Sequence, residues 1–214
     1  MVLPDVYLEL ATDAGVFSPG RLDPGTRLLL EESPAPPAAG DLLDLGCGYG
    51  PVACVLAKRS PGATVWAVDV NERALELCAR NARAAGLENV RCVTPGDASP
   101  PERFAAIWSN PPVRIGKDAL HALLGQWLAR LGPGASGSPA ASGGSARPAA
   151  SGGSARPAAS GGSAYLVVGR NLGADSLHRW LAEQGWPVTR LAARSGYRLL
   201  EVDFPAERAE VTRP

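Results

Sequence analysis

The chain lacks any run of about 18 consecutive apolar residues, which is the length that a membrane-spanning helix requires. Its first 15 residues contain three acids but no Lys or Arg, unlike a secretory or transit signal. Only four cysteines are present, at irregular spacing and without a Cys-x-x-Cys pair. Such cysteines indicate neither a zinc site nor a disulfide framework. We therefore expect a reduced, cytoplasmic protein with no membrane contact and no bound metal.

The chain also lacks net charge, because 21 basic and 21 acidic residues balance over its 214 positions. Generic nucleic-acid binders are usually more basic than this. The charge is unevenly distributed: residues 1–33 carry six acids and two bases, whereas residues 110–214 carry twelve bases and seven acids. The C-terminal excess of bases either forms one basic face or is scattered over the surface, and the sequence leaves both possibilities open.

Residues 136–163 contain no Leu, Ile, Val or aromatic side chain. A nine-residue unit, Ser-Ala-Arg-Pro-Ala-Ala-Ser-Gly-Gly, is repeated at 145–153 and 154–162, after a near copy at 136–144. A solenoid repeat would need an apolar face in each unit, so we interpret the tract as a flexible loop insertion. The predicted organisation is an N-terminal segment at 1–33 that packs on the core, one domain at 34–204 with this insertion, and a tail at 205–214.

Short apolar runs alternate with amphipathic stretches in the rest of the chain. The apolar runs predict buried strands at 42–45, 64–69, 90–94, 104–109 and 165–169. Helical periodicity appears at 71–85, where Asn71 can cap the helix, and at 117–131 and 175–184. Residues 188–193 and 197–204 flank Ser195-Gly196 as a hairpin. Five βα units followed by a hairpin predict an α/β fold, with a doubly wound, mostly parallel sheet and one antiparallel strand.

The motif Asp44-Leu-Gly-Cys-Gly-Tyr-Gly50 lies where a predicted strand turns into a helix. Glycines there allow close approach of a ligand, and the helix that follows presents free N–H groups. Asp69 ends the next strand, where a carboxylate can accept both ribose hydroxyls of a nucleoside. A dinucleotide site would need Gly-x-Gly-x-x-Gly, whereas the spacing here is Gly-x-Gly-x-Gly. S-adenosylmethionine, which has no pyrophosphate, suits this variant better.

Asp97 follows the third predicted strand and its chain neighbour is Ala98. At the carboxyl edge of the sheet, the Asp97 carboxylate can accept a hydrogen bond from an adenine amino group. Capping of its own turn is the alternative role for this side chain.

Asn110-Pro111-Pro112 follows the fourth predicted strand. An exocyclic amine on a base is a poor nucleophile, because its lone pair is delocalised into the ring. The Asn110 side-chain oxygen and the Pro111 carbonyl can each accept one amine hydrogen and direct the lone pair at a methyl donor, while the prolines stiffen the loop. No strong general base is required, and His121 and His178 lie on predicted helices as surface or packing residues.

Two bases, Arg114 and Lys117, come directly after this motif. They can contact a phosphate or another part of a nucleotide substrate. Solvent-exposed residues at the start of a helix are the alternative.

These segments resemble the small class I S-adenosylmethionine-dependent methyltransferases of the ribosomal RNA guanine-N2-methyltransferase type. The resemblance rests on residues 44–51, 68–71 and 110–117, with weaker likeness at 17–18, 22–30 and 196–200. It implies a seven-stranded Rossmann-like sheet with a C-terminal antiparallel hairpin, and methyl transfer to the 2-amino group of a guanine in small-subunit ribosomal RNA. The cofactor-binding residues expected from the motifs are Asp44, Gly46, Cys47, Gly48, Gly50, Asp69, Val70, Asn71, Asp97, Ala98 and Asn110. The catalytic and substrate-binding residues are Asn110, Pro111, Pro112, Arg114 and Lys117.

Two other functions remain open. Relatives that methylate adenine or protein glutamine usually carry an aromatic residue after the second proline, where this chain has Val113, which argues against those substrates. A protein-glutamine N-methyltransferase is therefore one alternative. The other is a non-catalytic module that binds the cofactor or the ribosome. The sequence gives no indication of the oligomeric state.

Overall fold

The computed structural model describes residues 1–13, 22–97, 100–132 and 162–205, so Ala98, most of the repeat tract and the tail from residue 206 lie outside the described residues. Seven strands form one sheet in the order β3-β2-β1-β4-β5-β7-β6. All neighbouring pairs are parallel except β5–β7 and β6–β7, so β7 alone runs against the others. The predicted mostly parallel, seven-stranded sheet with an antiparallel hairpin is confirmed.

The strands are β1 (Ala39–Leu45), β2 (Gly62–Val68), β3 (Val90–Val93), β4 (Ala106–Ser109), β5 (Ser163–Gly169), β6 (Val188–Arg194) and β7 (Tyr197–Asp203). The α-helices are α1 (Pro24–Glu32), α2 (Pro51–Arg59), α3 (Glu72–Ala84), α4 (Lys117–Leu128) and α5 (Ala174–Glu183). Two short 3-10 helices, η1 (Val113–Ile115) and η2 (Arg170–Leu172), precede α4 and α5.

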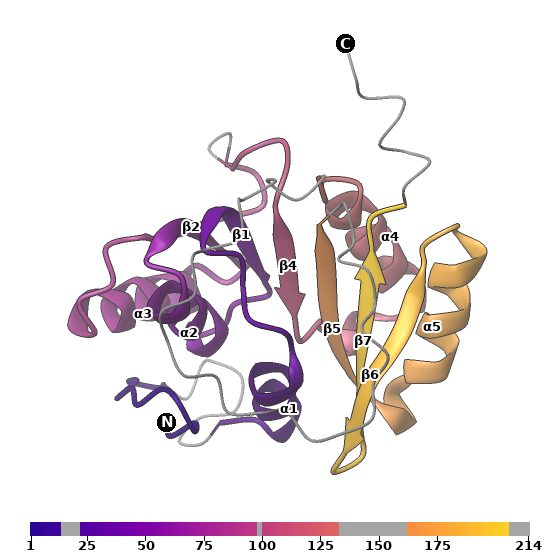
Figure 1. Cartoon of the computed structure of the whole chain (residues 1–214), viewed down its shortest axis with the longest axis horizontal. Helices are drawn as coiled ribbons and strands as arrows, with labels where there is room; N and C mark the ends of the chain where they lie inside the picture. The colour runs from indigo at the N-terminus through magenta and orange to yellow at the C-terminus, as the bar shows by residue number, and fades with distance from the viewer. Residues whose placement is uncertain (14–21, 98–99, 133–161, 206–214) are drawn as a thin grey trace.

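Helices cover both faces of the sheet (Figure 1). On one face α1, α2 and α3 contribute residues such as Leu29, Leu56 and Cys78 to a core that includes Trp108 of β4. On the other face α4 and α5 pack residues such as Leu124 against the opposite side chains of the same strands. The central strands β4 and β5 alternate their side chains between the two cores, which is why almost all of their residues are buried.

One predicted βα unit lacks its helix. Among the described residues between β3 and β4, 94–97 and 100–105, there is a turn at 95–96 but no helix. The segment contains Pro95, Pro100 and Pro101. Each proline removes a backbone donor and restricts the residue before it, which disfavours a helix there.

The N-terminal segment is held to α2 and α3 by polar contacts. Asp5 accepts two hydrogen bonds of 2.8 Å from Arg59, and these bonds, together with the Arg59 charge, hold the pKa of that carboxyl below its usual range. The Asn81 side chain pairs with both backbone groups of Ala11, at 2.8 and 2.9 Å. Residues 1–13 therefore lie against the helices that follow the glycine loop.

Within the described residues, no helix has the length and apolar character needed to cross a lipid bilayer. All four cysteines are free thiols. No group of three or more His, Cys, Asp or Glu side chains in the described part of the chain is placed to hold a metal ion.

Candidate active site

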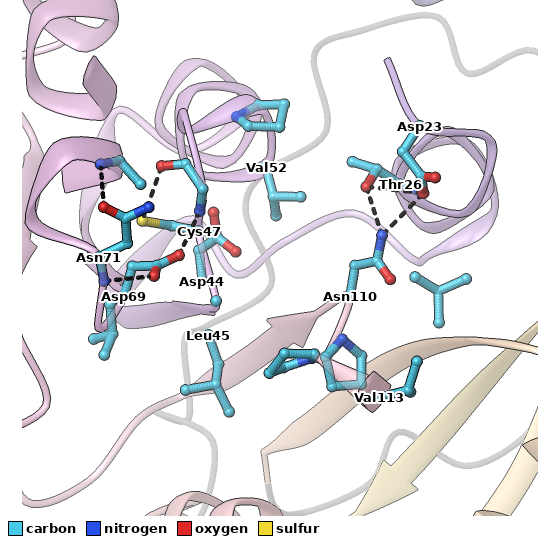
Figure 2. Close-up of a pocket in the computed structure, with 18 of the residues that line it drawn as sticks. Asp23, Thr26, Asp44, Leu45, Cys47, Val52, Asp69, Asn71, Asn110 and Val113 are labelled. Carbon is cyan, nitrogen blue, oxygen red and sulfur yellow. Dashed lines mark hydrogen bonds between the residues drawn. The ribbon is translucent and has the colours of Figure 1, made fainter. Parts of the chain in front are cut away.

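A cavity of about 450 Å³ opens at the carboxyl edge of the sheet, where β1, β2, β4 and β5 end. Ligand sites of α/β folds lie at this edge, since the loops there are built on a rigid sheet. The sequence-predicted residues that line the cavity are Asp44, Gly46, Cys47, Gly48, Asp69, Val70, Asn71, Asn110, Pro111, Pro112 and Arg114. Figure 2 shows the two motifs on opposite sides of the opening, with Asp69 on one side and Asn110 on the other.

The loop after β1 winds tightly around the end of β2. Gly46, Gly48 and Gly50 have φ values of +77°, +54° and +88°, a region that other residues rarely adopt. The backbone N–H groups of Gly46 and Cys47 both donate to the Val68 carbonyl, at 2.8 and 3.0 Å. These bonds fix the loop against the neighbouring strand and leave its outer surface facing the cavity.

Asp69 organises the same loop from β2. Its Oδ2 accepts the Gly48 N–H at 2.9 Å, and its Oδ1 accepts the Asn71 N–H at the same distance (Figure 2). A carboxylate has about four lone-pair positions, so two remain for ribose hydroxyls. Val70, beside it, is 81% exposed and presents an apolar surface to the cavity.

Asp44 is a buried acid beneath the loop. It accepts the Ala53 N–H of α2 at 2.8 Å. Burial raises the pKa of Asp44 to about 8, the Asp69 charge acts in the same direction, and the Ala53 hydrogen bond opposes both. An incoming cation would reverse this balance, because a nearby positive charge favours the carboxylate.

These residues fit S-adenosylmethionine. The acids Asp44 and Asp69 suit a cofactor with a sulfonium and an ammonium group, and Asp69 has lone pairs for the ribose. Apart from Gly48 and its two chain neighbours, no described atom lies within 4 Å of the position that a Cβ at Gly48 would occupy. The loop surface is therefore accessible to a ligand.

Asn110 is fixed by two side chains from the start of α1. Its Nδ2 donates to Asp23 Oδ2 at 2.9 Å and to Thr26 Oγ1 at 3.0 Å (Figure 2). Both partners are buried, with exposed fractions of 7% and 5%. The amide has only two N–H donors, so its orientation is set and Oδ1 lies on the opposite side as an acceptor.

Asp23, which accepts a hydrogen bond from the Asn110 amide, also accepts hydrogen bonds from Thr26 and Tyr197. It caps α1 by accepting the Thr26 N–H at 2.9 Å, with Pro24 at the start of the helix. Its second oxygen lies 3.3 Å from the Tyr197 hydroxyl, which donates to it. Burial raises the pKa of Tyr197, and the Asp23 charge and hydrogen bond act in the same direction. Asp23, Thr26 and Tyr197 line the cavity and were not identified from the sequence.

The Pro111 carbonyl already accepts one hydrogen bond from the backbone. The Val113 N–H donates to it at 2.8 Å, and the Ile115 N–H donates to the Pro112 carbonyl at 3.0 Å. A carbonyl oxygen has two lone pairs, so Pro111 can accept one further hydrogen bond. Ile115, 48% exposed, adds an apolar side chain to the cavity wall.

Three of the residues expected at the site do not line the cavity: Gly50, Asp97 and Lys117. A Cβ at Gly50 would lie 2.5 Å from Cys78 Sγ, so this glycine allows α2 and α3 to approach closely. Asp97 Oδ2 accepts the Thr94 N–H at 2.6 Å, which is the turn-capping alternative. Ala98 lies outside the described residues.

The Methyltransferase small domain family matches residues 7–135 of the chain. The uncharacterized protein YbxB of Bacillus subtilis is 41% identical over 115 residues, which make up 52% of this chain and 57% of that protein. Ribosomal RNA small subunit methyltransferase C of Aeromonas hydrophila is 38% identical over 126 residues, 59% of this chain and 36% of that protein. The chain thus spans little more than half of the first relative and about a third of the second.

Solved structures share the fold. The 16S rRNA N2 G methyltransferase RsmC of T. thermophilus, in complex with AdoMet and guanosine, matches with a TM-score of 0.61 and 25% identity over 89% of this chain and 46% of that one. A methyltransferase from Pyrococcus furiosus matches with a TM-score of 0.64 and 19% identity, over 92% of this chain and 88% of that one. The second likeness concerns the fold alone.

Proposed function

Because the chain belongs to the Methyltransferase small domain family, whose members are class I S-adenosylmethionine-dependent methyltransferases, we propose that it methylates RNA. The reaction is transfer of a methyl group to the exocyclic 2-amino group of a guanine, and the substrate is small-subunit ribosomal RNA in the cytoplasm. The names of the Aeromonas relative and the T. thermophilus structure favour this substrate, and the chain spans 36% of the first protein and 46% of the second.

The fixed orientation of Asn110 is the observation that carries this proposal. Asp23 and Thr26 take both amide hydrogens, so Oδ1 is left as a hydrogen-bond acceptor beside the Pro111 carbonyl. Two acceptors at the end of β4 match the two hydrogens of a primary exocyclic amine. Drawing both hydrogens to one side directs the nitrogen lone pair away from the ring, toward the glycine loop across the cavity.

The cofactor, when bound at the glycine loop, supplies an electrophilic methyl group on a positively charged sulfur. The chain's own residues then provide position and charge: Asp44 and Asp69 complement the positive cofactor, and Asn110 with Pro111 orients the amine. Neither Asn110 nor the Pro111 carbonyl is a strong base. The proton lost from the methylated amine therefore passes to water at the cavity mouth.

The best test is methyl incorporation from tritiated S-adenosylmethionine. Purified protein is mixed separately with bare ribosomal RNA, small subunits and total protein from a strain lacking the gene. We expect label in RNA, recovered as N2-methylguanosine after digestion. Label in protein would instead assign the chain to protein-glutamine methylation, and cofactor binding without any transfer would identify a non-catalytic module.

Asn110→Ala is the informative variant in this assay. Loss of one preorganised hydrogen-bonding group costs about 10²–10³ in turnover in other enzymes, and we expect a loss of that size here. Cofactor affinity and melting temperature are measured alongside, because the variant also leaves the buried Asp23 and Thr26 without their Asn110 partner, and the loss of turnover must exceed any loss of folded, cofactor-bound protein. Full activity of the variant on RNA would refute the role given to Asn110.

A further inference from the structure

Four arginines surround the end of the β6–β7 hairpin. Arg170 begins η2, Arg190 and Arg194 belong to β6, and Arg198 belongs to β7. Together they line a second recess, which we call the arginine recess, with Tyr197 at its boundary. The sequence left open whether the excess bases of residues 110–214 gather on one face or are scattered. Four of them gather in this recess.

The arginine recess adjoins the cavity. Tyr197 lines both, and Gly169, which lines the cavity, is followed directly by Arg170. The Arg170 N–H donates to the Gly196 carbonyl at 2.7 Å and ties η2 to the hairpin turn. Figure 1 shows that turn at the same end of the sheet as α1, the helix that fixes Asn110.

The recess keeps unneutralised positive charge. Arg194 pairs with Glu31 and Glu32 of α1, and Arg198 pairs with Asp175 of α5. Among the described residues no ion pair involves Arg170 or Arg190, both of which are exposed. Each guanidinium carries five N–H donors, and its planar fork suits phosphate oxygens.

Protection of a sheet edge is a competing explanation, since charged side chains on edge strands discourage pairing with other chains. It accounts for Arg190 and Arg194, which lie on the edge strand β6. It does not account for Arg170, which follows the interior strand β5, whereas the ion pair with Asp175 accounts for Arg198 on β7. Arg170 and Arg190 come from two separate elements to one recess without a carboxylate partner among the described residues, and a polyanion provides a reason for that convergence.

We propose that the arginine recess binds backbone phosphates of the RNA strand that carries the target nucleotide. The inference rests on the proposed function, because the base must occupy the cavity beside Tyr197 for its neighbouring phosphates to reach the recess. Phosphate contacts position a substrate and bind without regard to sequence. The recess thus holds the strand while the cavity selects the base.

The test measures RNA binding separately from catalysis. A fluorescein-labelled fragment of small-subunit ribosomal RNA is titrated with the S-adenosylhomocysteine-loaded protein, and anisotropy is recorded over a range of salt concentrations. The variant is Arg170→Gln with Arg190→Gln. The matched control is Arg80→Gln with Arg83→Gln, two exposed arginines on α3, beside β3 at the opposite edge of the sheet.

We expect the recess variant to raise the RNA Kd about tenfold or more at low salt. The slope of log Kd against log salt should fall by about two, one for each lost phosphate contact. The control should bind as the wild type does, and the cofactor Kd and melting temperature of both variants should be unchanged. Equal Kd and slope for the recess variant and the wild type would overturn the proposal.

The outcomes separate this proposal from the proposed function. Methyl transfer to RNA with unaltered binding by the recess variant rejects the recess alone. Recess-dependent RNA binding by a protein that transfers no methyl group rejects the proposed activity but keeps the recess. Retention of acidic proteins rather than RNA would assign the recess to a protein partner and overturn the inference.

Discussion

Thr26 is a small side chain that helps to fix the orientation of Asn110. Its hydroxyl accepts one Asn110 N–H and lies 3.5 Å from Asp23 Oδ2, so it bridges the two. Removing the hydroxyl frees one amide hydrogen of Asn110 while leaving the Asp23 cap of α1 in place. The amide is then held by its hydrogen bond to Asp23 alone, so its orientation is less firmly fixed.

Thr26→Val should therefore lower kcat about tenfold or more on RNA, because a misplaced acceptor loses the benefit of preorganisation. The KM for S-adenosylmethionine should be unchanged. Thr26→Ser retains the hydroxyl and serves as the matched control, with activity near that of the wild type. Steady-state methyl transfer by the wild type and the two variants measures kcat and KM. Equal kcat for the Val and Ser variants would contradict the role of the hydroxyl.

Asp44 makes stability depend on pH in the direction opposite to most carboxylates. The folded protein holds the Asp44 proton up to about pH 8, whereas the ordinary value of this pKa is 3.8. Between these values the folded state binds more protons than the unfolded chain, so the free energy of unfolding falls as pH rises.

We expect the stability of the cofactor-free protein to decline between pH 5 and pH 8, a window below the folded pKa of Asp44 of about 8. Asp44→Asn accepts the Ala53 N–H equally well but does not ionise, so its decline should be shallower. Urea unfolding at several pH values measures the free energy of unfolding of both proteins. Parallel profiles for the two proteins would show that Asp44 is not the titrating group.

At the level of elements, Gly50 decides how closely α2 and α3 pack. Its φ is +88°, and an added Cβ would meet Cys78 Sγ at 2.5 Å. Gly50→Ala combines a left-handed backbone with overpacking, so we expect a loss of about 3 kcal/mol in the free energy of unfolding. Gly86→Ala is the control, since Gly86 has φ +69° but open space around it, and it should cost only about 1 kcal/mol. Chemical denaturation distinguishes the two, and equal losses would exclude the packing explanation.

The helix α1 shows what sequence patterns can miss at this scale. Asp23-Pro24 is an N-cap followed by a first-turn proline, a known signal for a helix start. The sequence analysis predicts only that residues 1–33 pack on the core, although this signal marks a helix within them. The nine residues of α1, with Leu28, Leu29 and Leu30 all buried, form a helix that positions Asn110 in the cavity.

At the scale of the whole molecule, the described residues that flank 133–161, Gly132 and Gly162, lie next to each other. The Gly162 N–H donates to the Gly132 carbonyl at 2.7 Å, next to the start of β5. Deleting residues 136–161 leaves a three-residue link between these glycines, an ordinary length for such a connection. The tract is therefore expected to be dispensable for folding.

For that deletion we expect the free energy of unfolding to stay the same or to rise by up to about 2 kcal/mol, since a shorter loop costs less entropy to close. Methyl transfer should persist. Thermal melting and the tritium assay on the shortened chain provide the measurement. Loss of folding or of cofactor binding would mean that the tract contributes to the structure.

The sequence by itself determined the sheet, the glycine loop and the candidate acceptors. These features are local, because a strand is visible as an apolar run and a ligand loop as glycines after it. Asn71 capping α3 was predicted in this way and is confirmed, with its side chain accepting from Arg73 N. The sequence placed the two motifs after the first and the fourth predicted strands, and the structure shows that both line one cavity.

Only the tertiary structure decided what fixes and surrounds Asn110. Asp23 lies 87 residues from Asn110 in the sequence, and Tyr197 lies 174 residues from Asp23. The arginine recess likewise draws on three separate elements. No periodicity encodes such pairings, since they arise only when the sheet brings distant segments to one edge.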